Sequence, residues 1–155
     1  FMTNGTINIG TLVRANIEIL EEVGDENFFL FGLSAEQVAE TRRDYRPWDI
    51  IAADQDLNAV MQLLKCGHFN QFEENLFDGI IDSVTSADDP WLTAADFRSF
   101  VDTQELVATA YRDQQRWTRM SIFNTANSGK FSTDRTILDY NSEIWHLLPV
   151  TPHSL

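Results

Sequence analysis

The sequence predicts an α/β fold in which a βαβ unit is followed by a mostly helical array. Residues 6–12 alternate polar side chains with β-branched or apolar ones, which is the period-two pattern of a half-buried strand. Residues 28–32, Phe-Phe-Leu-Phe-Gly, form a continuous apolar run typical of a strand that is buried on both faces of a parallel sheet. From Ser34 onward the apolar residues recur at helical spacing, so we expect helices in the rest of the chain.

A helix is expected between the two strands. Ile17, Leu20 and Val23 recur at helical spacing within residues 15–23, and Gly24 follows as a residue suited to end a helix. A strand, a helix and a second strand within about 30 residues make a βαβ unit, which belongs to a parallel sheet.

The remaining helices are expected from their caps, breaks and apolar faces. Residues typical of helix starts are Ser34 with Gln37 as a capping box, Pro47, Asp113, and Ser132 or Thr133. Breaks are expected at Gly67, at Asp88-Asp89-Pro90 and at Gly129. The predicted apolar faces are Leu57, Val60, Met61 and Leu64; Phe72, Leu76, Phe77, Ile80, Ile81 and Val84; Phe97, Phe100, Val101, Gln104, Val107, Ala108 and Tyr111; Trp117, Met120, Ile122 and Phe123; and Ile137, Tyr140, Ile144 and Trp145.

The composition excludes several kinds of partner. Hydrophobic residues make up 43% and charged residues 23% of the chain, as in an ordinary globular protein. The net charge of −13 has the wrong sign for binding nucleic acid or an acidic membrane surface. The single cysteine, Cys66, fits a reducing compartment, and no apolar run reaches the ~20 residues of a membrane span. We therefore expect a soluble, cytoplasmic protein with no nucleic-acid or membrane partner.

The candidate sites are individually weak. Cys66 and His68 place a thiol and an imidazole two residues apart, which leaves a metal site as one hypothesis. A second pair at zinc spacing is missing, so we expect no metal. His146 and His153 have no adjacent Ser or Cys nucleophile. The acidic pairs, expected on solvated faces because neighbours on a helix point apart, are Glu21-Glu22, Glu73-Glu74 and Asp88-Asp89.

Several blocks of the sequence match, in order and at matching spacing, the motifs of one known protein family. The first blocks are Asn4-Gly5 with residues 9–12 and 15–19, which resemble N-G-A-L-T-I-G-T-L-D-G-A-N-V-E, and residues 21–32, which resemble E-E-V-G-x-E-N-x-F-x-F-G. The later blocks are residues 95–104, 111–120 and 128–145, which resemble A-D-[FY]-x-x-Y-V-x-C-Q, Y-x-x-x-x-x-W-T-R-M and S-G-K-F-S-S-D-R-T-I-x-x-Y-x-x-x-I-W. Together these blocks resemble the α-glucan phosphorylases of glycogen, starch and maltodextrin. They cover the chain from Phe1 to about Val150, but only the C-terminal minority of a full family member.

The resemblance implies a fold and a reaction. The fold is the two-lobed glycosyltransferase type B (GT-B), with the active site between two Rossmann-like lobes. Residues 1–155 would be the C-terminal segment of the pyridoxal-phosphate-binding lobe, an incomplete domain. The reaction is the cleavage of terminal α-1,4-glucosyl units by inorganic phosphate to give α-glucose 1-phosphate. The family includes allosteric enzymes of glycogen degradation, and the full enzyme is expected to be a homodimer.

The resemblance also implies pyridoxal 5′-phosphate, held on a lysine, whose phosphate works as a proton relay. The family's cofactor pattern, E-A-[SC]-G-x-[GS]-x-M-K-x-x-[LM]-N, has only its tail in this chain. Phe1 and Met2 are its two free positions and Asn4 its closing Asn, so the lysine would immediately precede Phe1. The chain opens on Phe rather than Met, which we interpret as a cut edge. We therefore expect no catalytic residue and no covalently bound cofactor in this chain. Some residues are expected to hold the segment that carries the cofactor without touching the cofactor: Asn4, Gly5, Gly10, Thr11 and Asn16.

The sequence departs from the family pattern at a few positions. Thr3 stands where the family has Leu or Met, and Thr103 replaces the usual Cys. Val13-Arg14 replaces Asp-Gly at the turn between the first strand and helix. If that turn keeps a positive φ, the new side chains are expected to cost roughly 1–2 kcal/mol. This change puts the activity of the parent enzyme in question.

Two functions follow from these observations. The first is a part of a phosphorylase that acts only together with the remainder of the enzyme. In the whole enzyme Ile144 and Trp145 are expected to pack against the N-terminal lobe, and in the isolated chain they are expected to be exposed. The alternative is a non-catalytic glucan-binding or protein-interaction module derived from the same fold, suggested by the missing lysine and by Val13-Arg14.

Overall fold

The structure, a computed structural model, describes residues 1–148, so the candidate His153 lies outside the described residues. Its elements, with η for short 3₁₀ turns and for the single π turn η5, are η1 (Met2–Asn4), β1 (Asn8–Gly10), α1 (Arg14–Val23), η2 (Asp25–Asn27), β2 (Phe28–Leu30), α2 (Ala35–Thr41), η3 (Arg42–Asp44), α3 (Pro47–Ala53), α4 (Gln55–Lys65), α5 (Asp78–Thr85), α6 (Thr93–Arg112), α7 (Gln114–Ala126), η4 (Asn127–Phe131), α8 (Thr133–Tyr140) and η5 (Asn141–Trp145). None of the helices within these residues is both long and apolar enough to cross a membrane.

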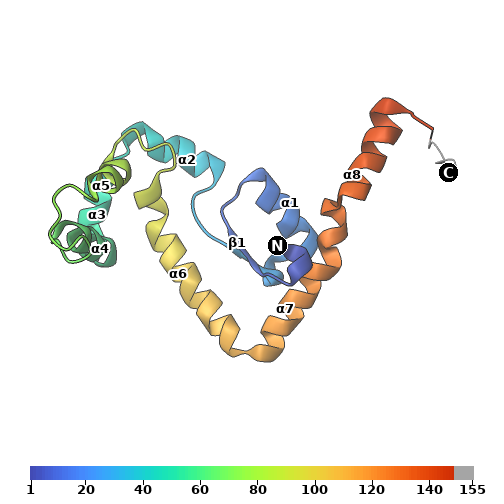
Figure 1. The fold of residues 1–155 in the computed structure, drawn as a ribbon, viewed down its shortest axis with the longest axis horizontal. Helices are drawn as coiled ribbons and strands as arrows, with labels where there is room; N and C mark the ends of the chain where they lie inside the picture. The colour runs from blue at the N-terminus through green and yellow to red at the C-terminus, as the bar shows by residue number, and fades with distance from the viewer. Residues whose placement is uncertain (149–155) are drawn as a thin grey trace.

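The long helices α6 and α7 form the two arms of a V (Figure 1). They meet at Asp113, whose side chain caps α7 by accepting a hydrogen bond from the Arg116 N–H. The βαβ unit lies between the arms, and α3, α4 and α5 gather at the far end of α6. Helix α8 continues beyond α7 on the opposite side of the molecule.

The predicted βαβ unit is present, with shorter strands than the patterns suggest. β1 and β2 pair in parallel, and Ile9 lies opposite Phe29. Phe28 and Phe29 are both buried and point to opposite faces of β2, as predicted, but Leu30 is 41% exposed. Each strand ends after three residues because the chain turns into the loop before the next helix.

The predicted helix boundaries are mostly confirmed. Ser34 and Gln37 form the reciprocal capping box, and Gly24 closes α1 by donating its N–H to the Leu20 carbonyl. The other predicted starts that the structure confirms are Pro47 in the first turn of α3, Asp113 before α7 and Ser132 before α8.

The predicted helical face from Phe72 to Val84 is wrong in its first half. Helix α5 begins only at Asp78, and Gln71, Phe72 and Asn75 all have positive φ angles. A residue in the left-handed region cannot continue a right-handed helix. The chain instead turns back on itself, with the Phe72 N–H donating to the Gly67 carbonyl, and the Phe72 side chain is 82% exposed.

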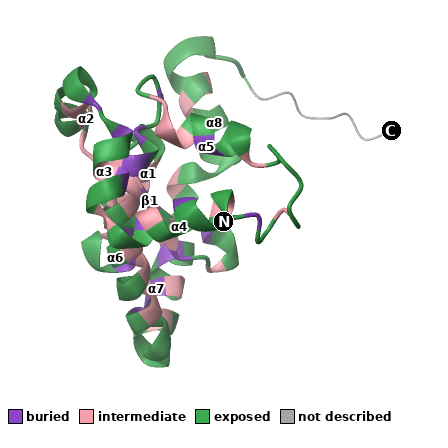
Figure 2. Cartoon of the chain, turned by 90° about the vertical axis from the view of Figure 1, so that its left-hand side faces the viewer, coloured by how far each residue is buried: buried purple, intermediate pink, exposed green. Residues whose placement is uncertain are grey.

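Three clusters of buried side chains make up the core, and most of the other residues are exposed or half-buried (Figure 2). The largest consists of Tyr45, Ile51, Leu57, Met61, Ile81, Leu92 and Ala94, in the helical array. The second, between the sheet and the arms of the V, consists of Ile7, Phe29, Ala110 and Met120. The third consists of Met2, Val23 and Phe28.

Helix α6 serves two of these clusters, which explains why its predicted single face is wrong. Its 20 residues span about 30 Å, so its two ends reach different cores. Ala94 packs in the helical array and Ala110 packs beside the sheet. Phe100 and Tyr111, predicted to be buried, are exposed, as are Val60 on α4 and Ile122 on α7.

A network of side-chain amides joins α7 to the sheet. Asn124 is fully buried, and its Oδ1 accepts a 2.6 Å hydrogen bond from the Asn8 amide in β1. The Asn124 amide donates to the Asn27 carbonyl at 2.9 Å and to the Met120 carbonyl at 3.0 Å. Asn27, also buried, donates to the Val23 carbonyl at the end of α1. None of the side-chain atoms of Asn8, Asn27 and Asn124 is both buried and without a hydrogen-bond partner.

An ion pair fixes α6 against the start of α4. Arg98 donates two hydrogen bonds to the Asp54 carboxylate, at 2.8 and 2.7 Å, and a third to Asp56 at 2.7 Å. Asp54 also caps α4 by accepting hydrogen bonds from the Asp56 and Leu57 N–H groups. The Arg98 hydrogen bonds, followed by those from the backbone, lower the pKa of Asp54 to about 2.

We predict that Asn124→Ala lowers the free energy of unfolding by about 2–4 kcal/mol, because it takes the Asn124 partner away from the half-buried Asn8 amide and from the carbonyl of the buried Asn27. Asn127→Ala is the matched control, since Asn127 lies at the end of the same helix in an exposed hydrogen bond. Its loss is expected to stay within about 0.5 kcal/mol. Both free energies of unfolding are measured by urea unfolding, and an equal decrease in Asn124→Ala and Asn127→Ala would contradict the role of the network.

We predict that the Arg98–Asp54 pair makes stability depend on pH. The folded-state pKa of Asp54 lies below its ordinary value of 3.8, so the pair stabilises the fold above that pH and the contribution is lost as the pH falls toward 2. The difference in urea midpoint between the wild type and Arg98→Gln should therefore shrink over that range. A difference that does not change with pH would argue against this assignment.

Candidate functional site

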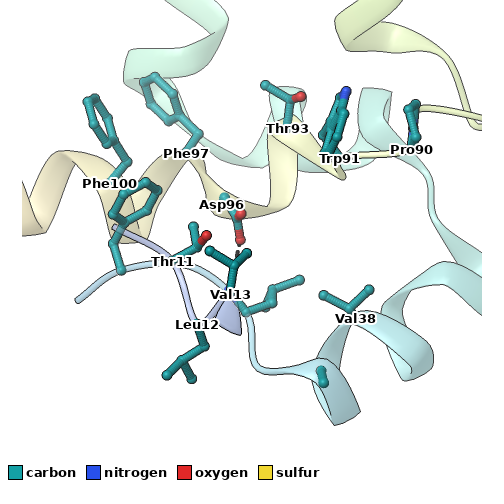
Figure 3. Close-up of a pocket in the computed structure, with 13 residues that line it drawn as sticks. Thr11, Leu12, Val13, Val38, Pro90, Trp91, Thr93, Asp96, Phe97 and Phe100 are labelled. Atoms are coloured by element: carbon teal, nitrogen blue, oxygen red, sulfur yellow. Dashed lines mark hydrogen bonds between the residues drawn. The ribbon is translucent and has the colours of Figure 1, made fainter. Parts of the chain in front are cut away.

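A groove opens beside the carboxyl ends of β1 and β2, where ligands bind in open α/β sheets. It encloses about 600 Å³ and is lined by the loops that follow the two strands, by α2 and by the first half of α6 (Figure 3). Its walls are mainly apolar and carry four aromatic side chains, those of Phe31, Trp91, Phe97 and Phe100.

The carboxylate in this groove is used to hold a loop. Asp96 Oδ1 accepts the Leu33 N–H at 2.9 Å, and the neighbouring Ser99 hydroxyl accepts the Gly32 N–H at 2.9 Å. Gly32 has a φ of +83°, and a Cβ there would lie 3.0 Å from Asp96 Oδ2. The residues among 1–148 that line the groove include a single carboxylate and no basic side chain, so they can bury apolar groups but supply neither an acid–base pair nor a cation for phosphate.

Three of the five predicted supporting residues come together at the end of β1. The Asn16 side-chain amide donates to the Thr11 carbonyl at 2.9 Å, which closes the turn between β1 and α1. A Cβ on Gly10 would collide with that amide, so a larger residue would displace Asn16. Gly10, Thr11 and Asn16 therefore shape this turn.

The other two predicted residues lie apart, at η1. Asn4 is exposed, whereas Gly5 has a φ of +71° and its carbonyl accepts a 2.8 Å hydrogen bond from the Ser121 hydroxyl. Thr125, one turn further along α7, donates to the Met2 carbonyl at 3.1 Å. Sequence reasoning missed Ser121 and Thr125. Their only signal is two hydroxyl side chains spaced four apart on a helix.

The strain expected at Val13-Arg14 if the turn kept a positive φ does not arise, because the turn does not have that geometry. Val13 is extended, with φ −95° and ψ 155°, and Arg14 is the first residue of α1, so neither has a positive φ. Because the turn does not use the left-handed region, it accepts side chains in place of Asp-Gly without the expected cost. Arg14 extends into solvent and lies 3.4 Å from Glu18.

Neither of the two lysines in the chain fits a covalently bound cofactor. Lys130 Nζ lies 2.7 Å from a Glu22 carboxylate oxygen, and the hydrogen bond to Glu22 raises the pKa of Lys130. Lys65 Nζ lies 4.4 Å from the centre of the Trp48 ring. A Schiff base needs an amine that can lose its proton, and neither amine lines the groove. No chemical step through a cofactor is therefore assigned to these residues.

The structure places the weaker candidate residues of the sequence, Cys66, His68 and Asp89, in different surroundings. The Cys66 thiol is exposed and lies 3.3 Å from the Leu63 carbonyl, and the His68 ring packs edge-on against Phe69. Within residues 1–148 no group of three or more His, Cys, Asp or Glu residues could hold a metal ion. Asp89 is buried and accepts hydrogen bonds from the backbone at the start of α6.

The apolar face of the last helix is exposed, as the sequence predicts. Ile144 is 61% and Trp145 47% exposed. The rings of Tyr140 and Trp145 stack with their centres 5.4 Å apart, so the end of α8 and the end of η5 pack against each other through these two side chains.

Comparison with known proteins gives a consistent result over almost the whole chain. The profile of the family described as carbohydrate phosphorylase matches residues 1–147. Glycogen phosphorylase of Synechocystis sp. is 48% identical over 151 residues, covering 97% of this chain and 18% of that protein. Glycogen phosphorylase of Chlamydia pneumoniae is 40% identical over 147 residues, with 95% and 18% covered. The α-1,4 glucan phosphorylase L isozyme of Ipomoea batatas is 44% identical over 155 residues, with 97% and 16% covered. The chain thus spans less than a fifth of the length of these relatives.

We predict opposite effects of alanine at two glycines. Gly5→Ala should lower the free energy of unfolding by about 1–3 kcal/mol, because it forces a side chain into the left-handed region and breaks the Ser121 hydrogen bond. The new Cβ would lie 2.5 Å from the Ser121 hydroxyl oxygen. Gly79 is the control, because it lies in α5 with open space around it, and Gly79→Ala should raise stability by about 0.5–1 kcal/mol. Equal effects in urea unfolding would refute the assignment of Gly5.

Proposed function

The chain belongs to the carbohydrate phosphorylase family, and on this premise we propose that it is the C-terminal segment of an α-glucan phosphorylase. The proposed whole enzyme cleaves terminal α-1,4-glucosyl units with inorganic phosphate and releases α-glucose 1-phosphate. The observation that carries this proposal is the match of residues 1–147 to one family, supported by relatives that are named glycogen or α-glucan phosphorylases. Glucan and phosphate are accordingly the proposed substrates of the whole enzyme.

We propose that residues 1–155 complete the pyridoxal-phosphate-binding lobe of a GT-B fold. Within residues 1–148 the sheet has two strands, and an isolated two-stranded sheet is marginal in water. Further strands from the remainder of the chain would extend it. The parallel pairing of β1 and β2 supports this arrangement, because parallel sheets occur with several strands and helices on both faces.

The proposed contribution of this segment is structural rather than catalytic. Pyridoxal 5′-phosphate would supply the proton relay in the full enzyme, bound to a lysine outside this segment. Gly10, Thr11 and Asn16 would shape the turn at the end of β1, and Asn4 and Gly5 would follow the cofactor lysine. The exposed face of α8 and η5, with Ile144 and Trp145, is the proposed contact with the N-terminal lobe. A homodimer in the cytoplasm is proposed for the full enzyme.

A second candidate is a non-catalytic module that binds glucan. The aromatic lining of the groove favours it, since Phe31, Trp91, Phe97 and Phe100 present ring faces and edges to a space of about 600 Å³. Against it, the single carboxylate there is already bonded to the Leu33 N–H, which leaves few polar groups to pair with sugar hydroxyls.

We predict that the full-length polypeptide carrying this sequence releases glucose 1-phosphate from maltodextrin and phosphate when pyridoxal phosphate is supplied. The 155 residues alone should release none, because they lack a lysine fitted for the cofactor. They should not bind maltodextrin, because the groove offers few free polar groups to sugar hydroxyls. Glucose 1-phosphate is measured by a coupled assay, and binding by calorimetry. An inactive full-length protein with bound cofactor would refute the proposal, and saturable maltodextrin binding by the 155 residues would favour the second candidate.

A further inference from the structure

The carboxylate in the groove beside β1 and β2 has one oxygen without a donor. Asp96 Oδ1 accepts the Leu33 N–H at 2.9 Å, but within the described part of the chain no N–H or O–H group donates to Oδ2. Gly32 keeps the surroundings of this oxygen open, because a Cβ there would lie 3.0 Å from it. Figure 3 shows the Asp96 side chain pointing from α6 toward the loop that carries Thr11 and Val13. The oxygen is therefore free to accept a hydrogen bond from a ligand.

The negative charge of this carboxylate is not balanced inside the groove. Among residues 1–148, those that line it include no lysine, arginine or histidine. Arg98, two positions further along α6, pairs with Asp54 at 2.7 Å instead. The Arg42 guanidinium donates to the carbonyls of Asp89 and Pro90 and does not line the groove. The groove thus favours a positively charged group, in a chain whose net charge is already −13.

An exposed tryptophan lies at the same groove on a loop that is held firmly. Trp91 is 79% exposed, although tryptophan is on average a well-buried residue. Its N–H donates to the Asp89 carboxylate at 2.9 Å, and the next residue, Leu92, is 1% exposed with a φ of +53°. Such a strained backbone persists only where its surroundings fix it, and it is common where ligands are held. The loop therefore presents the Trp91 ring to the groove from a fixed position.

The volume and the lining of the groove indicate the class of ligand. About 600 Å³ lies within the range of small-molecule sites, which are mainly apolar and have a few polar groups that fix orientation. The rings of Phe31, Phe97 and Phe100, together with Trp91, can cover a flat apolar body. One free carboxylate oxygen suits one ammonium group, and aromatic faces attract cations as well. A sugar would leave most of its hydroxyls without partners here.

We propose that this groove binds a small organic cation, which combines an aromatic ring with a protonated amine. The amine donates to Asp96 Oδ2, and the ring lies against Trp91 and the phenylalanine side chains. This assignment uses only the geometry of the lining residues, which lie between positions 11 and 100, so it does not rest on the proposed function.

The test measures binding of three probes to the full-length polypeptide by calorimetry. The probes are naphthylmethylamine, naphthylmethanol and naphthoate, which carry a cation, a neutral group and an anion at the same ring position. Asp96→Asn removes the charge but keeps an oxygen for the Leu33 N–H, and Trp91→Ala removes the exposed ring. Trp48→Ala is the matched control, because Trp48 is an exposed tryptophan on α3 that does not line the groove.

We expect the amine to bind saturably with a Kd on the order of 0.1 mM, and the alcohol to bind about 10-fold more weakly. Asp96→Asn should weaken binding of the amine about 10-fold and leave that of the alcohol unchanged. Trp91→Ala should weaken binding of both by about 3- to 10-fold. Trp48→Ala should behave like the wild type.

Several results would overturn the assignment. These are an amine that does not saturate the protein at about 5 mM, naphthoate that binds as tightly as the amine, or unchanged amine binding in either groove variant. Because Trp91 is exposed, its variant tests the site even if Asp96→Asn does not fold. Displacement of the amine by maltodextrin would also overturn it, in favour of a glucan site. The assay contains no phosphate or pyridoxal phosphate, so a failure of the proposed function leaves this test intact.

Discussion

The buried amide of Asn124 is the contact on which the sheet half of the molecule depends. Its side chain bonds at once to β1, through Asn8, and to the turn before β2, through the Asn27 carbonyl. An amide can be buried at low cost only when its donors and acceptor all find partners, so the three segments must keep one relative position. That requirement holds α7 in one position against β1 and the turn before β2.

Polar side chains, rather than apolar ones, set the geometry where the elements meet. Arg98 reaches from α6 to the cap of α4, Asp96 holds the loop after β2, and Ser121 holds the turn η1. Apolar contacts supply most of the free energy of folding but have little directionality, whereas hydrogen bonds to a carbonyl or carboxylate fix distance and angle. The groove at the end of the strands therefore has a defined shape even though its walls are apolar.

Much of the fold could be predicted because its signals are local. The βαβ unit, the capping box at Ser34 and the caps at Asp113 and Ser132 each depend on residues within a few positions. The predictions that were wrong concern long-range packing. Apolar periodicity does not reveal that α6 turns different faces to two cores, or that the chain near Phe72 enters the left-handed region. The hydrogen bonds of Ser121 and Thr125 reach a partner more than a hundred residues away, so their spacing of four on a helix does not identify that partner.

The division of the core along α6 has a consequence for how the chain responds to damage. The helical array is formed by residues 45–94, which are close in sequence, whereas the core at the sheet joins Ile7 and Phe29 to Ala110 and Met120. Local contacts form quickly, and contacts across long loops must first overcome the entropy of closing them. We therefore expect the two halves to behave as separate cooperative units that share one helix. A defect in either core is then expected to melt its own half first, and the intact half would remain a folded template on which the other can re-form.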